Sequence, residues 1–260
     1  MITSTKNEQV KTVIELQKKA KARNEAGVFV VEGVRMAMEL PKERTERVFV
    51  SESFLADPEN GALLGGLPSY ETVSDSVFSA MSDTRTPQGI LAVVRQSRYT
   101  LSELLGEGRA AHIMVLENLQ DPGNLGTIVR AGEGAGITGV LMSRDTVDLY
   151  NPKVIRSTMG SIFRVPFLYT DDLERTAGEL KEKGIRLCAA HLAGKNSYDR
   201  EVYTGGTAFL IGNEGNGLSD RLSDMADILV KIPMAGKVES LNAAVAASIL
   251  MFETARQRRG

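Results

Sequence analysis

Three polar, glycine-bearing segments in the second half of the chain carry residues that could bind a ligand and assist a reaction. The first runs from Asn118 through Asp121 and Asn124 to Gly126, and Arg130 follows four residues later. Turn-forming residues lead here into a predicted helix, whose first free N–H groups can bind an anion. Arg130 lies about one helical turn beyond the segment. The pattern indicates an anion-binding loop, although an ordinary turn beside a surface arginine has the same local sequence.

The second segment holds Gly212, Glu214 and Gly217 directly after a predicted strand. A tight turn needs one or two glycines, whereas three within six residues favour a backbone that approaches a ligand closely. The third segment, 232–242, joins a predicted strand to a closing helix expected from about Ser240. Ser240 could be no more than the N-cap of that helix. A cap explains Ser240 but leaves the rest of this loop unexplained.

Several other patterns point away from common chemistries. Residues 134–139 match G-x-G-x-x-G, but a predicted helix precedes them and a strand follows, which is the reverse of a dinucleotide-binding turn. No G-x-S-x-G elbow is present, so a serine hydrolase is not predicted. His112 begins a strand and His191 ends one, and we expect structural roles for both. One cysteine and two histidines are too few for a Cys/His zinc site.

The elements that would position these segments alternate from residue 111 onwards. Apolar runs predict strands at 111–119, 139–143, 166–170, 186–193, 207–212 and 227–233, with helices after the first segment and at 151–163, 173–184 and 240–256. Such alternation predicts an α/β fold with a mainly parallel sheet. Ligands bind such sheets at the carboxyl ends of the strands. All three segments lie at strand ends.

The first 95 residues predict a separate, smaller α/β unit. An amphipathic opening helix is followed by strands at 28–33, 47–53 and 89–94 and by helices at 34–40 and 74–81. The stretch after them is charged and contains glycine, as expected of a linker. We therefore expect a first domain at 1–97, a linker at 98–110 and a second domain at 111–260.

Composition indicates a soluble protein with a real core, since 42% of residues are hydrophobic and 25% are charged. No apolar run is long enough to span a bilayer, and the opening residues have no signal-peptide core. The single Cys188 suggests a reducing compartment, so we expect a cytoplasmic protein. The net charge of −2 argues weakly against nucleic acid. Basic clusters at 1–23 and 151–164 are either RNA contacts or solvated faces.

Together the three segments resemble the three motifs of the SpoU/TrmH family, in the SPOUT methyltransferase class. The first resembles N-x-x-D-P-x-N-x-G-x-x-x-R, the second G-x-E-x-x-G, and the third I-P-M-x-G-x-x-x-S-L-N. These patterns are met, in order, by Asn118, Asp121, Pro122, Asn124, Gly126 and Arg130, by Gly212, Glu214 and Gly217, and by Ile232, Pro233, Met234, Gly236, Ser240, Leu241 and Asn242. The sequences FVVEG and PQGILAVV resemble the L30e-like substrate-binding domain of the rRNA-type members.

The resemblance implies a C-terminal SPOUT domain with a trefoil knot, an L30e-like N-terminal domain and a homodimer. It implies that S-adenosylmethionine is the cofactor, without a metal, and that RNA is the substrate, most simply rRNA. The implied cofactor-binding positions are Leu192, Gly212, Ile232 and Leu241. The implied catalytic set is Arg130, Asn124, Glu214, Ser240 and Asn242.

The implied reaction is methyl transfer to a ribose 2′-hydroxyl in 23S rRNA. The family assigns the proton-removing role to the first-motif arginine, but a guanidinium loses its proton only above about pH 12. We therefore expect Arg130 to hold phosphate and to stabilise the developing alkoxide. A tRNA ribose methyltransferase, a base methyltransferase, a drug-resistance rRNA methyltransferase and an inactive knotted RNA-binding protein remain as alternatives.

Overall fold

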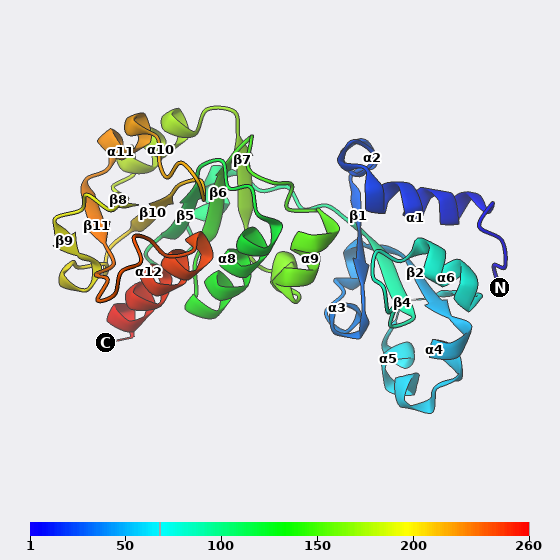
Figure 1. The fold of residues 1–260 in the computed structure, drawn as a ribbon. Helices are drawn as coiled ribbons and strands as arrows, with labels where there is room; N and C mark the ends of the chain where they lie inside the picture. Colours follow the sequence, from blue (N-terminus) through cyan, green and yellow to red (C-terminus); the bar gives the residue numbers. More distant parts are fainter. Residues whose placement is uncertain (68, 260) are drawn as a thin grey trace. The chain divides into compact units, whose positions relative to one another are not determined.

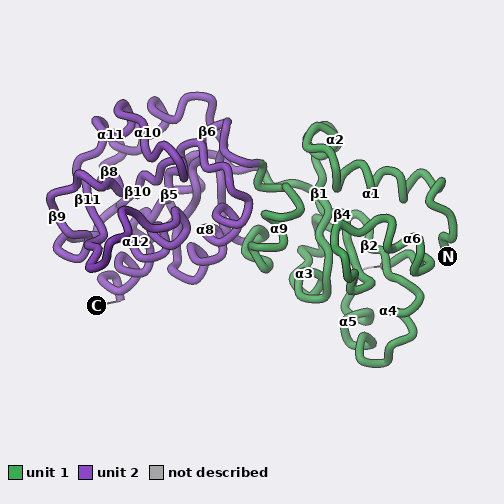
Figure 2. Tube along the Cα trace, in the orientation of Figure 1, with its two compact units in different colours: residues 1–97, 148–163 green, residues 98–147, 164–260 purple. Residues whose placement is uncertain are grey.

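The computed structural model describes residues 1–67 and 69–259, which form two compact units (Figures 1 and 2). Unit 1 holds residues 1–97 and 148–163, and unit 2 holds residues 98–147 and 164–260. No described helix is long and apolar enough to cross a membrane. The α/β class expected from the sequence is confirmed in both units.

Unit 1 is built on a four-stranded mixed sheet in the order β1-β4-β2-β3. Strand β4 (Ile90–Arg95) pairs antiparallel with β1 (Val28–Glu32) and β2 (Thr45–Ser51), and β2 pairs parallel with β3 (Glu71–Val73). Its α-helices are α1 (Glu8–Lys18), α2 (Ala20–Ala26), α3 (Val34–Met38), α4 (Glu52–Ala56), α5 (Gly61–Gly66), α6 (Asp75–Met81) and α9 (Pro152–Thr158). Short 3₁₀ turns occur at Lys42–Arg44, Pro58–Asn60 and Ser161–Phe163. The sequence patterns did not predict α4, α5 or β3.

The segment 148–163 belongs to unit 1 although unit 2 precedes and follows it in the chain. Arg23 is 4% exposed and donates to the Asp148 carboxylate, with its Nη2 2.6 Å from Oδ2. The ring of Tyr150 lies 4.5 Å from the ring of Phe29 on β1, and Phe163 lies beside the same Phe29 ring. These buried contacts make 148–163 part of the first unit's core.

Unit 2 is built on a seven-stranded sheet in the order β7-β6-β5-β10-β8-β11-β9, with every pair parallel. The strands are β5 (His112–Leu116), β6 (Gly139–Ser143), β7 (Phe167–Thr170), β8 (Arg186–Ala190), β9 (Asn196–Ser197), β10 (Thr207–Ile211) and β11 (Ile228–Lys231). The helices are α7 (Leu101–Leu104), α8 (Pro122–Ala135), α10 (Leu173–Glu182), α11 (Asp220–Met225) and α12 (Ala243–Arg258), with a 3₁₀ turn at Tyr198–Arg200. Strand β9 and helix α11 were not predicted. The trefoil knot stays a prediction.

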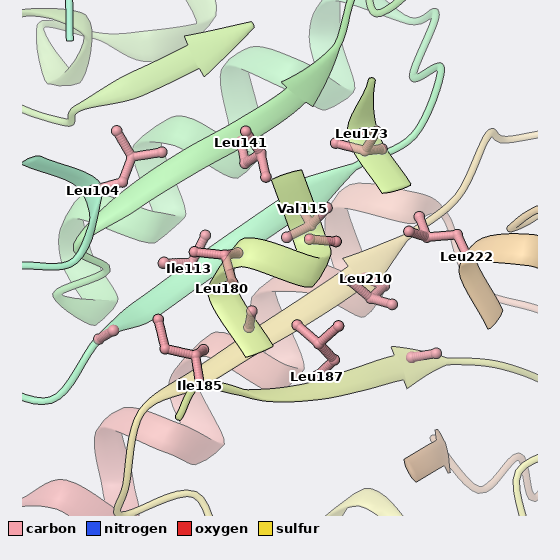
Figure 3. Close-up of a cluster of buried hydrophobic side chains, with 14 residues drawn as sticks. Leu104, Ile113, Val115, Leu141, Leu173, Leu180, Ile185, Leu187, Leu210 and Leu222 are labelled. Carbon is pink, nitrogen blue, oxygen red and sulfur yellow. The ribbon is translucent and has the colours of Figure 1, made fainter. Parts of the chain in front are cut away.

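The central strands are buried on both faces, as expected of a parallel sheet covered by helices. Every residue of β5, β6 and β10 is buried. Figure 3 shows one apolar cluster, in which Ile113, Leu141, Leu187 and Leu210 from four strands meet Leu180 of α10. Leu104 of α7 is fully buried in this cluster, so the stretch 98–110 contributes to the core of unit 2. This core holds the strand ends that carry the three segments.

Helix α8 begins earlier than the sequence pattern suggested. Asp121 is its N-cap and accepts from the backbone N–H of Asn124, and Pro122 occupies the first turn. Asn124 and Gly126 therefore lie in the helix rather than in a loop before it. The helix ends at Gly136, whose φ of 71° is left-handed. This C-cap explains Gly136, the central glycine of the 134–139 pattern, without a nucleotide.

The closing helix begins later than predicted, because Asn242 rather than Ser240 is its N-cap. The Asn242 side chain accepts from the backbone N–H groups of Ala244 and Val245. Helix α12 packs against α8 (Figure 1). A methyl group on Gly132 of α8 would lie 2.4 Å from Ile137, so glycine permits the Ile137 side chain to pack on the helix. The same methyl group would lie 3.4 Å from the Met251 sulfur of α12.

Candidate functional site

A cavity of about 420 Å³ lies at the carboxyl ends of the strands of unit 2. Loops that follow β8, β10 and β11, together with the first turns of α12, line it. Its volume lies within the usual range for small-molecule sites. Its place at the strand ends is where ligands bind in parallel α/β sheets. The cavity is the candidate site of the protein.

The loop after β10 folds back on itself at its two outer glycines. Asn213 and Gly217 form an antiparallel bridge, and Gly217 has a left-handed φ of 71°. A methyl group on Gly212 would lie 2.1 Å from the carbonyl carbon of Gly217, a distance that no packing tolerates. Glycine at 212 allows the two ends of the loop to pack backbone against backbone, and glycine at 217 allows the left-handed turn beside the cavity.

Glu214 in the same loop organises the start of α8. One carboxylate oxygen accepts from the Asp121 N–H at 3.0 Å and from the Asn124 side-chain amide at 2.9 Å, and the other accepts from the Gln120 N–H at 3.0 Å. Partial loss of hydration raises the pKa of Glu214, but these hydrogen bonds outweigh it and hold the pKa below its usual value. Glu214 is thus a fixed anion beside the cavity.

Asn124 connects Glu214 to the closing helix. Its side-chain nitrogen donates to Glu214, and its side-chain oxygen accepts from the Asn242 amide at 2.8 Å. Asn124 is 8% exposed, and Asn242 caps α12 with its other side-chain atom. A chain of hydrogen bonds therefore joins the first, second and third segments, which the sequence placed at separate strand ends.

Residues 233–241 of the third segment differ from the first two segments in their lack of hydrogen bonds. Within the described part of the chain, none of residues 233–241 makes a hydrogen bond. Ser240 and Leu241 line the cavity, and Ser240 is exposed. Val238 is 61% exposed although it is apolar. This loop borders the cavity without being tied to the rest of the site.

Arg130 lies on the exposed side of α8, six residues after Asn124. It does not line the cavity, and it makes no hydrogen bond or ion pair with residues 1–67 or 69–259. A free guanidinium presents five N–H donors that suit phosphate. Arg130 is therefore available to a ligand that arrives from outside the protein.

Most of the predicted site residues come together around one cavity. The four predicted cofactor positions line it, and so do three of the five predicted catalytic residues; these seven are Leu192, Gly212, Glu214, Ile232, Ser240, Leu241 and Asn242. Asn124 is linked to the cavity through hydrogen bonds, and Arg130 stands apart from it.

Three charged or ionisable side chains at the cavity were not among the predicted residues. His191, Lys231 and Glu239 line it. The His191 Nδ1 accepts from the Ala193 N–H at 3.1 Å, which shapes the loop after β8. The signal for His191 and Lys231 is their position at the end of a strand. We expected a structural role for His191 from the sequence, and in the structure it also lines the cavity. The described residues contain no cluster of His, Cys, Asp and Glu that could hold a metal ion.

Both parts of the chain match known protein families. Residues 111–252 match the model of the SpoU rRNA Methylase family, and residues 7–92 match the MRM3-like substrate binding domain. The chain is 33% identical over 253 residues, covering 96% of it and 97% of the relative, to the 23S rRNA (guanosine(2553)-2′-O)-methyltransferase RlmP of Bacillus subtilis.

Two solved structures match almost the whole chain. The AdoMet-bound rRNA methyltransferase from Sinorhizobium meliloti has a TM-score of 0.83 at 30% identity and covers 98% of this chain and 97% of its own. The SpoU methyltransferase AviRb from Streptomyces viridochromogenes, in complex with AdoMet, has a TM-score of 0.87 at 25% identity, covering 98% and 99%. Fold and site thus define an α/β RNA methyltransferase with a substrate-binding domain. The chain belongs to the SpoU rRNA Methylase family.

Proposed function

We propose that the protein transfers a methyl group from S-adenosylmethionine to a ribose 2′-hydroxyl in 23S rRNA. The observation that carries this proposal is the hydrogen-bonded chain from Glu214 through Asn124 to Asn242 at the edge of a ligand-sized cavity. An RNA-binding protein without activity has no need of this hydrogen-bonded chain, whose central member, Asn124, is 8% exposed. Relatives named as 23S rRNA and AdoMet-binding methyltransferases support the substrate and the cofactor.

The cavity suits the proposed cofactor in size and charge. Leu192, Gly212, Ile232 and Leu241 line it, and so do two acidic residues, Glu214 and Glu239, beside Lys231 and His191. Carboxylates favour a cationic ligand. When bound, S-adenosylmethionine supplies an electrophilic methyl group on a positively charged sulfur, so the reaction needs no metal.

We assign to Arg130 the stabilisation of the negative charge that develops on the ribose oxygen. A ribose hydroxyl is a poor nucleophile until its proton leaves or its developing charge is stabilised. Arg130 is exposed and unpaired within the described residues, so its guanidinium can hold an RNA phosphate and stabilise the alkoxide. Glu214, Asn124 and Asn242 fix the first turn of α8, the helix that carries Arg130 further along. Ser240 borders the cavity from the third segment.

Labelled methyl transfer to protein-free 23S rRNA and to tRNA tests this function. We expect label in 23S rRNA, and nuclease digestion should give a 2′-O-methylated nucleoside whose position primer extension then maps. The same reaction in chelator should proceed at an unchanged rate. Label in tRNA alone would favour the tRNA alternative, label on a base would contradict ribose transfer, and tight RNA binding without transfer would favour the inactive alternative.

We propose a division of labour in which residues 1–97, with 148–163 packed into the same unit, bind RNA. Residues 98–110 join the domains, and the rest of 111–260 binds the cofactor and catalyses transfer. The match of residues 7–92 to a substrate binding domain supports the first part. The basic residues expected to contact RNA are partly engaged: Arg23 is buried against Asp148, and Arg156 pairs with Asp83 at 2.8 Å. Lys153 remains exposed. We place the reaction in the cytoplasm, where the buried free thiol of Cys188 would stay reduced.

We propose that two copies associate through α8 and α12. Val245 and Phe252 of α12 are each 47% exposed although apolar. A methyl group on Gly134 of α8 would lie 3.7 Å from the Phe252 ring, so these side chains border both helices. A two-fold contact would cover the same patch on each copy. Light scattering should give a dimer for the native chain and a monomer for Phe252→Asp, and a monomeric native chain would contradict this interface.

A further inference from the structure

Ser143 is a polar residue of the site that no motif of the sequence marks. It is the last residue of β6, whose parallel pairing with β5 brings it to the edge of the sheet where the first segment begins. Ser143 is 9% exposed, although serine is mostly a surface residue. A buried hydroxyl in this place is expected to form hydrogen bonds with a neighbouring group of the first segment.

The residue that it contacts, Asn118, has an unusual backbone. Asn118 has a left-handed φ of 52°, and among the described residues only one other non-glycine, Met159, has a positive φ. Left-handed backbone is unfavourable for residues with a Cβ, although asparagine tolerates it better than most. Such a conformation persists where surrounding contacts hold it.

Ser143 supplies those contacts in both directions. Its Oγ accepts from the Asn118 backbone N–H at 2.8 Å and donates to the Asn118 side-chain oxygen at 2.8 Å. Thr146 lies on the same hydroxyl, with the two side-chain oxygens 3.1 Å apart. Ser143 thus binds the main chain and the side chain of Asn118 at once, which selects a single conformation.

That conformation fixes the groups that follow Asn118. Its carbonyl accepts from the Asn213 side chain at 2.8 Å and from the Gln120 side chain at 3.2 Å. Two and three residues later, the N–H groups of Gln120 and Asp121 point to the Glu214 carboxylate. The turn at Asn118 therefore sets the direction of the backbone that meets Glu214 and begins α8.

We infer that Ser143 is a positioning residue for methyl transfer. It holds the backbone of Asn118 in the left-handed conformation, so that the residues at the start of α8 stay in place to donate to Glu214. This inference rests on the proposed function for its kinetic consequence, and on the hydrogen bonds alone for its structural one. Ser143 itself does not line the cavity. Its loss should therefore lower turnover with little effect on cofactor affinity.

The first experiment compares Ser143→Ala with Ser143→Thr and with a matched control, Thr207→Val. Thr207 is 1% exposed and its hydroxyl donates to the Gly205 carbonyl at 3.0 Å, at the start of β10 rather than at its carboxyl end. We expect kcat to fall about tenfold for Ser143→Ala, to recover in Ser143→Thr, and to stay within about twofold for the control. The Kd for S-adenosylmethionine should stay within about twofold throughout. A parallel loss of cofactor affinity, or an equal loss in the control, would overturn the inference.

The second experiment uses Asn118→Gly, because glycine adopts a positive φ without steric strain. In that background, Ser143→Ala should lower kcat by less than about threefold, since little conformational preference remains to be supplied. A full tenfold loss in both backgrounds would show that Ser143 acts through another group, and the inference would be wrong.

Amide hydrogen exchange separates this inference from the proposed function. In Ser143→Ala, exchange should quicken in peptides spanning 117–124 and stay unchanged in β8 and β11, whether or not the protein methylates RNA. Native protein that transfers no methyl group would refute the proposed function only. Unchanged exchange at 117–124 would refute the role of Ser143 only.

Discussion

The two sides of the cavity are built in opposite ways. On one side, the turn after β5 and the loop after β10 are joined by Glu214, Asn124 and Asn213 through short hydrogen bonds. On the other side, residues 233–241 make no hydrogen bond within the described chain, and most of them are exposed. The bonded side also carries Arg130 on its helix. The same cavity therefore has one preorganised wall and one adaptable wall.

This difference indicates how the work is divided. Electrostatic stabilisation of a transition state needs groups that are already in place, because moving them during the reaction is unfavourable. A loop that closes over a small molecule needs the opposite property, since it must open for exchange. We therefore expect substitutions in the bonded wall to change turnover, and substitutions in the adaptable wall to be better tolerated.

The largest expected effect belongs to the free guanidinium beside the bonded wall. Arg130→Ala should lower kcat by about two orders of magnitude or more, in line with loss of one key electrostatic donor. Cofactor affinity should be unchanged, because Arg130 does not line the cavity. Arg130→Lys should rescue only in part, since an ammonium lacks the guanidinium fork. Single-turnover methylation beside cofactor titration measures both quantities, with Arg221→Ala, 83% exposed, as control. Near-normal turnover in Arg130→Ala would remove it from the catalytic set.

The next effect compares the same substitution on the two walls. In Gly212→Ala the new methyl group would collide with Gly217, whereas nothing lies within 4 Å of such a group at Gly236. Overpacking of this kind should weaken cofactor binding roughly 10- to 100-fold at Gly212. Gly236→Ala should stay within about twofold. Calorimetric titration with S-adenosylmethionine measures both affinities. Equal affinities in the two variants would contradict the difference between the two walls.

A third comparison uses the two carboxylates of the cavity. Glu214 accepts from three donors, and Glu239 accepts from none within the described residues. Glu214→Gln would present an amide N–H₂ to groups that also donate, so kcat should fall about tenfold. Glu239→Gln should change kcat by less than about threefold. Steady-state rates on the mapped rRNA fragment measure both, and a larger loss in Glu239→Gln would reverse our assignment of the walls.

The last effect lies at the opposite edge of the sheet and concerns stability rather than turnover or binding. Burial, and then the charges of Arg258 and Arg109, lower the pKa of His112 to about 3. An unfolded chain protonates histidine near pH 6.5. Below that pH the unfolded state binds a proton that the folded state does not, so the free energy of unfolding falls as pH drops towards 3.

His112→Leu should remove this dependence. The His112 Nε2 is buried without a hydrogen-bond partner in the described residues, so the variant loses no hydrogen bond at that atom. The loss of stability between pH 7 and pH 5 should shrink by about 2 kcal/mol. Urea unfolding at the two pH values measures it, and an unchanged pH dependence would mean that another group governs acid stability.

The strands and the meeting of the three segments could be predicted from sequence, because both follow from general rules. Fully buried strands such as β5 and β10 are continuous apolar runs, and parallel strands bring their carboxyl ends to one edge. The start of α12 could not, because Ser240 and Asn242 are both good caps. Asn242 is the cap in the structure, where its amide also bonds Asn124 from 118 residues away.

Other features depend on contacts that no local pattern carries. Ser143 closes an ordinary apolar strand, and only its bonds to Asn118 distinguish it. The assignment of 148–163 to unit 1 depends on pairs such as Arg23 with Asp148, 125 residues apart. Short elements such as β3 are below the length at which periodicity can be recognised.

Because residues 148–163 pack in unit 1, the way in which such proteins can acquire new targets is restricted. A gene recombined at residue 97 would separate Phe29 from Tyr150 and leave Asp148 without Arg23. Buried partners left alone in this way are strongly destabilising. Unit 1 is therefore encoded by two separate pieces of sequence that must move together. Lineages with this architecture should change their target by point substitutions on the surface of unit 1, and laboratory chimaeras should graft 1–97 and 148–163 from the same parent.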